Sequence, residues 1–159
     1  MRAKRDLDLE IPAGVSDGLR LHLPGQGEVG FAGGSSGDIY LEISVTPHPI
    51  YSREGDDLVG ILELPISDAA LGSEVEIETL DGPRTVKVDA GAQHGDVITV
   101  KGFGATKLRG RGRGDLKIVV RVLTPSKLDS KQKDIFRKLR EVTKDDSPRM
   151  ASRKPRGRF

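Results

Sequence analysis

The three histidines are the first residues to test for chemistry, because imidazole can serve as metal ligand, acid or base. His22 falls in an alternating apolar stretch, His48 stands between two prolines, and His94 falls in a turn. No two of them have the spacing of a metal-binding pair, and the sequence has no cysteine that could complete a zinc site. We therefore predict surface histidines, no metal site and no catalytic residue.

Adjacent acids and glycine pairs are the other patterns that can indicate catalysis or phosphate binding. Asp56-Asp57 and Asp145-Asp146 are paired, but both pairs have the composition of a solvated turn or tail. The glycine pairs in 25–27 and 102–104 are not followed by the Gly-Lys-Ser/Thr that leads a phosphate loop into a helix. We predict that the protein is not an enzyme and needs no cofactor.

Two basic segments could bind nucleic acid. The run 109–114 reads RGRGRG, and the tail segment 153–158 reads RKPRGR. Arginine and glycine in alternation can bind single strands through charge and guanidinium stacking, and such binding weakens steeply with salt. A nucleic-acid-binding module therefore stays open as an alternative, although we do not expect nucleic acid to be the main partner.

Composition sets the class of protein. The chain has 159 residues, a net charge of +2, no cysteine, and 35% hydrophobic residues. Residues 143–159 hold six basic and two acidic residues, net +4, which leaves −2 for the rest. No apolar run reaches the roughly 18–20 residues that a membrane span needs, and the N-terminus has no signal-peptide core. We expect a cytoplasmic protein without a membrane partner.

The elements that position these residues occur twice, because segment 9–45 resembles segment 86–122 at a constant offset of 77 residues. Most identities are glycines, which indicates a shared backbone shape. The first copy of the Arg/Gly loop, 32–37, keeps the glycines at Gly33 and Gly37 and has no arginine, so loop geometry explains these glycines without nucleic acid. The identical pairs are Ala13/Ala90, Gly14/Gly91, Gly18/Gly95, Gly25/Gly102, Gly27/Gly104, Gly33/Gly110, Gly37/Gly114, Asp38/Asp115 and Val45/Val122.

Alternation of apolar and polar residues predicts short strands throughout. One helical turn is expected at 67–71, and a turn is expected at 53–57. Short strands with glycine-rich turns favour an all-β fold of two tandem small sandwich-like or barrel-like domains. The predicted strands are 5–11, 19–23, 39–45, 58–66, 75–79, 85–89, 96–101 and 116–123.

One helix follows the strands. Asp129 is its expected N-cap, and Gln132 three residues later completes a capping box. Ile135, Leu139 and Val142 share one face. The helix could pack on its own domain or on a second copy of the chain. Beyond it, we expect residues 143–159 to form a disordered basic tail.

Many short motifs, in a fixed order, resemble one protein family. Residues 2–142 are similar to the C-terminal half of the DnaJ family of J-domain co-chaperones. The resemblance implies two stacked β-domains that hold unfolded clients, followed by a dimerisation helix. The motifs are Ile11-Pro-Ala-Gly-Val15, Asp17-Gly18, Gly37-Asp38-Ile-Tyr40, Pro47-His-Pro49, Glu54-Gly-Asp-Asp-Leu58, Ala69-Ala-Leu-Gly72, Thr79-Leu-Asp-Gly82, Arg113-Gly-Asp-Leu116 and Thr124-Pro125.

The sequence also departs from the family pattern. Its only His-Pro, at His48-Pro49, is followed by Ile50 and not by the aspartate of a J-domain. The glycine/phenylalanine segment and the cysteine-rich zinc domain of the family are absent from the sequence. We expect a fragment with a truncated first β-domain at 1–47, a second β-domain at 48–125, a dimerisation helix at 126–142 and the tail at 143–159.

The resemblance also implies the functional residues and partners. Unfolded or partly folded proteins are the expected clients, and a DnaK-type chaperone is the expected partner of the full-length protein. Capture by strand addition at an exposed sheet edge is the expected mechanism, while an inert structural fragment is a further alternative. The expected client groove comprises Leu7, Leu9, Ile39, Leu41 and Ile43, and the expected homodimer contact comprises Ile135, Phe136, Leu139 and Val142.

Overall fold

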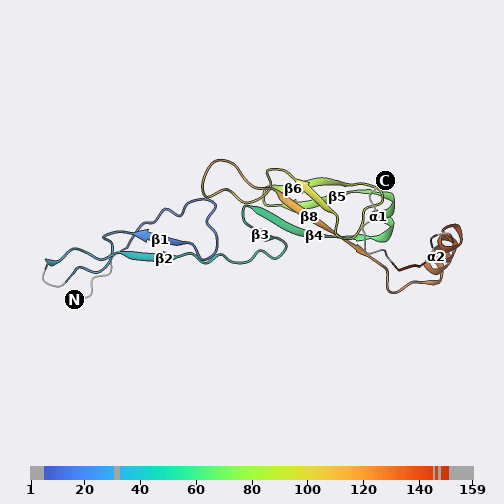
Figure 1. The fold of residues 1–159 in the computed structure, drawn as a ribbon, viewed down its shortest axis with the longest axis horizontal. Helices are drawn as coiled ribbons and strands as arrows, with labels where there is room; N and C mark the ends of the chain where they lie inside the picture. Colours follow the sequence, from blue (N-terminus) through green and yellow to red (C-terminus); the bar gives the residue numbers. More distant parts are fainter. Residues whose placement is uncertain (1–5, 31–32, 145, 147, 151–159) are drawn as a thin grey trace. The chain divides into compact units, whose positions relative to one another are not determined.

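The computed structural model describes residues 6–30, 33–144, 146 and 148–150. The chain forms two compact units, Met1–Leu123 and Thr124–Phe159. The described part of the first unit is built mainly from strands, and the second contains a single described helix (Figure 1). The predicted all-β fold with a C-terminal helix is confirmed.

The first repeat contributes a two-stranded antiparallel sheet. It pairs β1 (Arg20–Leu23) with β2 (Ile39–Glu42), and Leu21 lies opposite Leu41. Both strands are shorter than predicted. No residue of this repeat is buried among 6–30 and 33–47, so the repeat has no closed core within the described chain.

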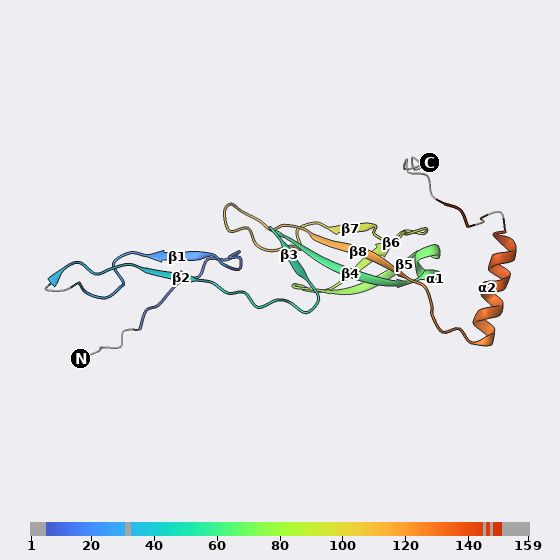
Figure 2. The same ribbon diagram turned by 60° about the horizontal axis from the view of Figure 1, so that its bottom comes forward.

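The second repeat holds the larger body. A four-stranded sheet has the order β3-β4-β8-β7, and β4 and β8 run parallel at its centre (Figure 2). A second sheet pairs β5 with β6, and α1 lies between β4 and β5 in sequence. The elements are β3 (Ser52–Glu54), β4 (Asp57–Pro65), α1 (Ile66–Leu71), β5 (Ser73–Thr79), β6 (Gly82–Val88), β7 (Val97–Val100) and β8 (Leu116–Leu123).

The core lies where the two sheets of the second repeat face each other. Strand β8 buries every second residue from Leu116 to Val120, as expected for a strand with one covered face. Its buried side chains pack against Val86 and Val88 of β6. Full burial of each such side chain contributes about 1.5–3 kcal/mol relative to exposure. The buried residues are Leu58, Leu64, Ala69, Val86, Val88, Leu116, Ile118 and Val120.

The internal repeat is confirmed by the strand register. The β1–β2 ladder pairs Arg20 with Glu42 and Leu23 with Ile39. Adding 77 to each number gives the pairs Val97–Val119 and Val100–Leu116, which are the observed pairs of the β7–β8 ladder. Strands β1 and β2 are therefore the counterparts of β7 and the first half of β8.

The loop hydrogen bonds repeat as well. Gly25 N donates to Asp38 Oδ1 at 2.9 Å, and its counterpart Gly102 N donates to Asp115 Oδ1 at 2.9 Å. Each aspartate thus accepts a backbone hydrogen bond across the long loop that joins the two strands of its ladder. The same holds for the pairs Gly27 N–Gly37 O (2.7 Å) and Gly104 N–Gly114 O (2.8 Å), and for Ile43 N–Leu19 O (2.8 Å) and Val120 N–Asp96 O (2.8 Å).

The predicted strand at 5–11 is wrong for its described part, residues 6–11, which adopt no regular structure. By the 77-residue offset this segment corresponds to β6, which forms only by pairing with β5. Counting back 77 residues from β5 leads outside residues 6–150, so the described chain supplies no pairing strand. An isolated strand leaves its backbone N–H and C=O groups without hydrogen-bond partners. Alternation of apolar and polar residues cannot make up for the missing neighbouring strand.

The predicted turn at 53–57 is too wide. Ser52–Glu54 forms β3, which pairs antiparallel with β4, and Ser52 lies opposite Val59. Only residues 55 and 56 remain as the turn of this hairpin, and Gly55 adopts a positive φ of 63°.

Helix α2 (Ser130–Val142) begins as predicted. Asp129 Oδ1 accepts from Gln132 N at 2.8 Å, and Gln132 Oε1 accepts from Asp129 N at 2.9 Å, which is the expected capping box.

Most of the tail for which we predicted disorder lies outside the described residues. In the part of the chain that the structure describes, no helix has the length and apolar character to cross a membrane.

Candidate functional site

The β1–β2 sheet has one apolar and one polar face. Leu21 and Leu41 form a cross-strand pair on the apolar face, next to the pair Leu23–Ile39. All four side chains are half-buried. Residues two apart in a strand share a face, so Ile39 and Leu41 lie on one face of β2, and the register places Leu23 and Leu21 opposite them.

This apolar face is covered in one repeat and not in the other. In the second repeat the counterparts of Ile39, Leu41 and Ile43 are Leu116, Ile118 and Val120, which are 1%, 3% and 1% exposed. The sheet of β5 and β6 covers them. No such sheet covers β1 and β2 among the described residues, so the first repeat presents an apolar face that the fold leaves open.

Leu7 and Leu9, the other two predicted groove residues, lie in the irregular segment before β1. Leu7 is half-buried and Leu9 is 38% exposed, whereas Val86, the counterpart of Leu9, is 6% exposed. No backbone hydrogen bond joins residues 6–13 to β1 or β2 in the described chain. The structure therefore does not bring these two residues into the ladder that holds Ile39 and Leu41.

The polar face of the same sheet is organised around Asp38. His22 Nε2 lies 2.7 Å from Asp38 Oδ2, and the ring of Tyr40 stacks on the imidazole with centroids 4.7 Å apart. The hydrogen bond from Gly25 N, followed by that from His22, lowers the pKa of Asp38 below its ordinary value. This arrangement fixes the loop between β1 and β2, and no group of three or more metal-ligating side chains gathers among the described residues.

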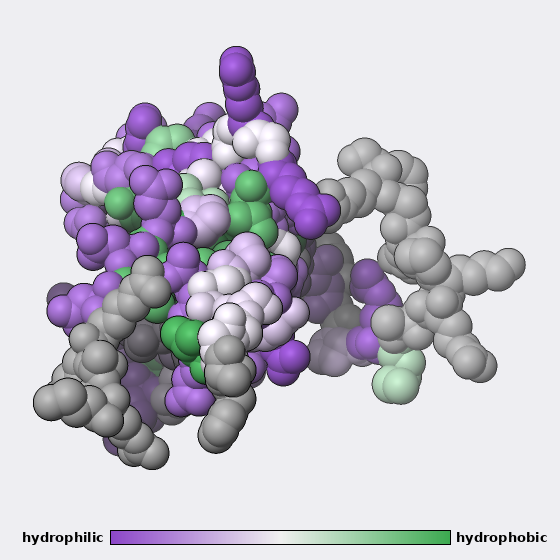
Figure 3. All heavy atoms as spheres, turned by 90° about the vertical axis from the view of Figure 1, so that its left-hand side faces the viewer, coloured by the Kyte–Doolittle hydropathy of each residue, from purple (hydrophilic) through white to green (hydrophobic). Residues whose placement is uncertain are grey.

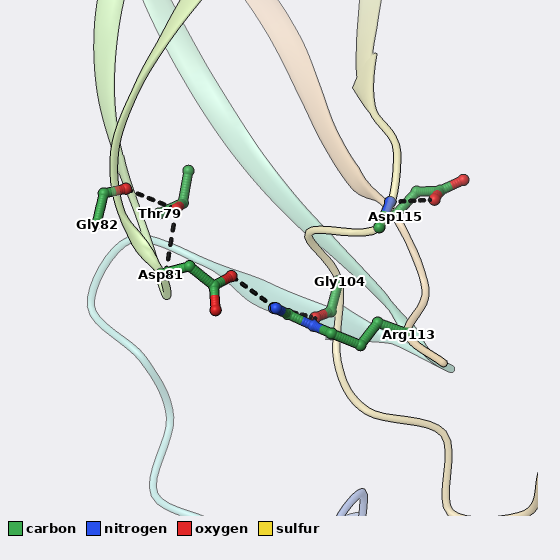
Figure 4. Close-up of polar contacts among 7 residues, drawn as sticks. Thr79, Asp81, Gly82, Gly104, Arg113 and Asp115 are labelled. Atoms are coloured by element: carbon green, nitrogen blue, oxygen red, sulfur yellow. Dashed lines mark hydrogen bonds and ion pairs between the residues drawn. The ribbon is translucent and has the colours of Figure 1, made fainter. Parts of the chain in front are cut away.

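The Arg/Gly loop is a structural element at its C-terminal end. Arg113 Nη1 donates to Asp81 Oδ2 at 2.6 Å, and its Nε and Nη2 donate to Gly104 O at 3.0 and 2.8 Å (Figure 4). The charge of Arg113 is therefore used within the fold. Arg109 and Arg111 are exposed, and the structure gives neither of them an ion pair among the described residues.

The sequence did not predict a second arginine that is equally engaged. Arg53 donates from Nη1 to Val15 O at 2.7 Å and from Nη2 to Gly14 O at 2.9 Å. A Cβ on Gly14 would lie 2.4 Å from Thr106 O, so only glycine allows the chain at this position to approach the backbone of Thr106 so closely. A cleft of about 910 Å³ adjoins these contacts, lined in part by Tyr51. The hydrogen bond from Arg53 to Gly14 O joins residues 39 positions apart, so no local sequence pattern indicates it.

The start of β4 is fixed to β8 by a carboxylate. Asp57 Oδ1 accepts from Asp115 N at 2.8 Å, and Asp57 Oδ2 lies 2.9 Å from Lys117 Nζ. The hydrogen bond from Asp115 N, followed by that from Lys117, lowers the pKa of Asp57, and Asp57 raises the pKa of Lys117. The acidic pair that the sequence placed in a solvated turn thus includes a residue that anchors the central strand.

In the second unit, helix α2 exposes its apolar stripe. Ile135, Leu139 and Val142 are exposed, and Phe136 is half-buried. No residue of the helix is buried. The stripe is therefore free to contact another surface, as required for the dimer contact that the sequence suggests.

Comparison with known proteins gives consistent results. Residues 1–125 match the family model described as the DnaJ C terminal domain. The chain is 46% identical over 151 residues to "Chaperone protein DnaJ" of Leifsonia xyli subsp. xyli, covering 95% of this chain and 41% of that protein. It is 44% identical over 148 residues to "Chaperone protein DnaJ 1" of Corynebacterium efficiens, covering 92% of this chain and 39% of that protein. The chain thus spans about two fifths of the length of these relatives.

Proposed function

The chain belongs to the DnaJ C terminal domain family, and from this premise we propose that it binds extended apolar segments of unfolded proteins, as the client-binding part of a chaperone. The observation that carries this proposal is the open apolar face of the β1–β2 sheet, whose counterpart in the second repeat is fully covered. In this role the protein acts by reversible binding and not by catalysis.

The open face suits an apolar client segment. In Figure 3, which views the molecule from the side where β1 and β2 lie in Figure 1, apolar residues are visible among polar ones. Removing apolar surface from water contributes about 25 cal/mol per Å². A client that covers the face would bury the side chains of Ile39, Leu41 and Ile43, with Leu7 and Leu9 as further contacts from the irregular segment.

We propose that α2 joins two copies of the chain through Ile135, Phe136, Leu139 and Val142. Each of these is exposed or half-buried in the second unit. Two binding faces in one dimer raise the effective affinity for a long client, because the second contact becomes intramolecular. We further propose, from the resemblance to the J-domain co-chaperones, that the full-length protein delivers clients to a DnaK-type chaperone in the cytoplasm.

The test is suppression of aggregation of a chemically unfolded model protein, at low and high salt. Leu41→Ser should weaken suppression, because it places a hydroxyl on the apolar face. Glu42→Ala is the matched control, since Glu42 is the next residue of β2, on the polar face, and its ion pair with Arg20 is exposed. Equal suppression by the two variants and the wild-type chain would refute the role of the apolar face.

The salt dependence separates this function from binding of nucleic acid through Arg109 and Arg111. Binding to phosphates loses orders of magnitude in affinity as salt rises, whereas apolar capture persists. Suppression that survives high salt supports the client-binding function. If the chain suppresses aggregation at neither low nor high salt, the inert structural fragment would be favoured.

A further inference from the structure

The connection between the two repeats comprises residues 43–51, from the end of β2 to the start of β3. Its first part is held to the first repeat by two hydrogen bonds. Ile43 N donates to Leu19 O at 2.8 Å, and Val45 N donates to Asp17 Oδ1 at 2.8 Å. The last part of the connection therefore decides how firmly the second repeat is joined to the first.

This last part is a turn built on His48, and we call residues 48–51 the junction turn. Pro49 has no backbone N–H, so the first amides available after His48 are those of Ile50 and Tyr51. Both amides donate to His48 Nδ1, at 3.1 Å each. The imidazole also stacks on the ring of Tyr51, with centroids 5.4 Å apart. A single ring nitrogen thus accepts from both backbone donors of the turn.

Tyr51 fixes the end of the junction turn to the second repeat. Its hydroxyl donates to Glu78 O, and its ring packs against the core cluster of this repeat. A Cβ on Gly60 would lie 2.6 Å from Tyr51 Cε1, so the ring lies directly against the backbone of β4. Burial, and after it the charge of Glu78, raises the pKa of Tyr51, so the phenol stays neutral near neutral pH. The ring therefore gives the imidazole of His48 a fixed surface to stack on.

The contacts of His48 depend on its protonation. Nδ1 accepts hydrogen bonds only while it carries no proton, because protonated imidazole has two donors and no acceptor. His48 is exposed, so a proton reaches it from solvent without any opening of the fold. Histidine is the side chain whose ordinary charge change falls between about pH 5 and 8. The junction turn thus has its acceptor at neutral pH and loses it in mild acid.

Three other charged side chains, Asp17, Arg53 and Asp56, line the cleft that His48 also lines. Arg53 Nη2 lies 3.9 Å from Asp56 Oδ1, and the guanidinium donates to two carbonyls of the first repeat. Carboxylate and guanidinium groups ordinarily titrate outside the range of about pH 5 to 8. Mild acid therefore acts on the imidazole and leaves the hydrogen bonds of Arg53 in place.

We propose that His48 is an acid-released contact that orders the junction between the two repeats. At neutral pH its imidazole holds the junction turn in the form that leads into β3. Protonation frees the amides of Ile50 and Tyr51 and leaves the hydrogen bonds of Arg53 to hold the repeats together. The inference concerns the junction alone, so it stands or falls independently of client binding.

The experiment follows amide exchange with solvent by NMR in the full chain. Protection is the exchange rate of an unfolded chain at the same pH divided by the observed rate. We expect protection at Ile50 and Tyr51 to fall at least about tenfold between about pH 7.5 and about pH 5.5. The amides of Ile118 and Val120 in β8 should stay protected. Unchanged protection at Ile50 and Tyr51, or an equal fall at Ile118 and Val120 through acid unfolding, would overturn the proposal.

Two substitutions separate the acceptor from the charge. Asparagine offers a side-chain oxygen that accepts from the backbone two residues on and does not titrate, so His48→Asn should keep the protection at both pH values. His48→Ala removes the acceptor and should lose the protection at both. His94→Asn changes a turn histidine of the second repeat and is the matched control, which should behave as the wild-type chain. A pH-dependent fall that persists in His48→Asn would contradict the proposal.

A second measurement tests the consequence for the junction. Arg53→Gln removes the guanidinium that donates to Gly14 O and Val15 O. In this variant, ¹⁵N relaxation should give β1 and β2 the same rotational correlation time as β4 and β8 at neutral pH. In mild acid we expect the value for β1 and β2 to fall about twofold, because the two repeats then move separately. Adding His48→Asn to this variant should restore a common value. Separate motion already at neutral pH, or common motion in acid, would refute the role of His48.

Discussion

Substitution of Gly114 by alanine gives the sharpest test of how the second repeat is held together. The new Cβ would lie 2.0 Å from Asp56 O and 2.4 Å from Asp56 C. Both atoms belong to the backbone, so no side-chain rotation can relieve the clash, and the start of β4 must move away from β8. That movement stretches the hydrogen bonds from Asp115 N to Asp57 Oδ1 (2.8 Å) and from Leu58 N to Asp115 O (2.9 Å).

The magnitude follows from these contacts. Overpacking of a fixed site costs about 1–3 kcal/mol, and each lost hydrogen bond costs about 0.5–1.5 kcal/mol. With two bonds affected, Gly114→Ala should lower the free energy of unfolding of the second repeat by about 2–6 kcal/mol. For a body of this size, 1 kcal/mol corresponds to about 4–8 °C in Tm, so Tm should fall by at least about 8 °C.

Gly37→Ala is the matched control, because Gly37 occupies the same position in the first repeat. A Cβ on Gly37 would meet only Glu28 O, at the ordinary van der Waals distance of 3.9 Å, and neither glycine has a positive φ. We expect the free energy of unfolding to change by no more than about 1 kcal/mol. Urea and thermal unfolding followed by circular dichroism measure both variants. A Gly114→Ala variant as stable as the wild-type chain would refute the steric reasoning, as would equal destabilisation by the two variants.

Two further predictions concern acid stability and assembly. The hydrogen bond from Asp115 N, and after it that from Lys117, lowers the pKa of Asp57 in the folded chain below the ordinary 3.8. The ionised Asp57 therefore contributes its full stabilisation of the fold above pH 3.8, and this contribution is lost as the pH falls through the lower folded pKa. Asp57→Asn should therefore reduce the acid-induced drop in the urea midpoint, and an unchanged drop would contradict this assignment. Phe136→Asp should convert a dimer to monomers in light scattering, whereas Lys138→Asp, on another face of α2, should not. A Phe136→Asp chain that remains dimeric would exclude the proposed contact.

The candidate site was only partly predictable from sequence. Alternation placed Ile39 and Leu41 on one face of a strand, and the structure pairs them across to Leu23 and Leu21. The same alternation placed Leu9 in a strand, which is wrong, because segment 6–11 has no pairing strand within the described chain. The roles of Leu41 and of the helix stripe in binding stay predictions that the experiments above address.

The sequence by itself determined the features that depend on neighbouring residues or on an internal match. The repeat follows from glycines at a constant offset, because each marks a local backbone shape. The capping box of Asp129 and Gln132 spans three residues, so its hydrogen bonds are encoded locally. The amphipathic stripe of α2 follows from helical spacing in the same way.

Tertiary structure alone decided the contacts between distant residues. The parallel pairing of β4 with β8, the anchoring of Asp57 by Asp115 N, and the donation of Arg53 to Gly14 O each join residues more than 35 positions apart. A strand becomes a strand only when a partner accepts its backbone hydrogen bonds, and a local pattern cannot supply that partner. For this reason two stretches related by the internal repeat have different outcomes here: β8 is central and buries every second residue from Leu116 to Val120, whereas β2 has a pairing strand on one side only within the described residues.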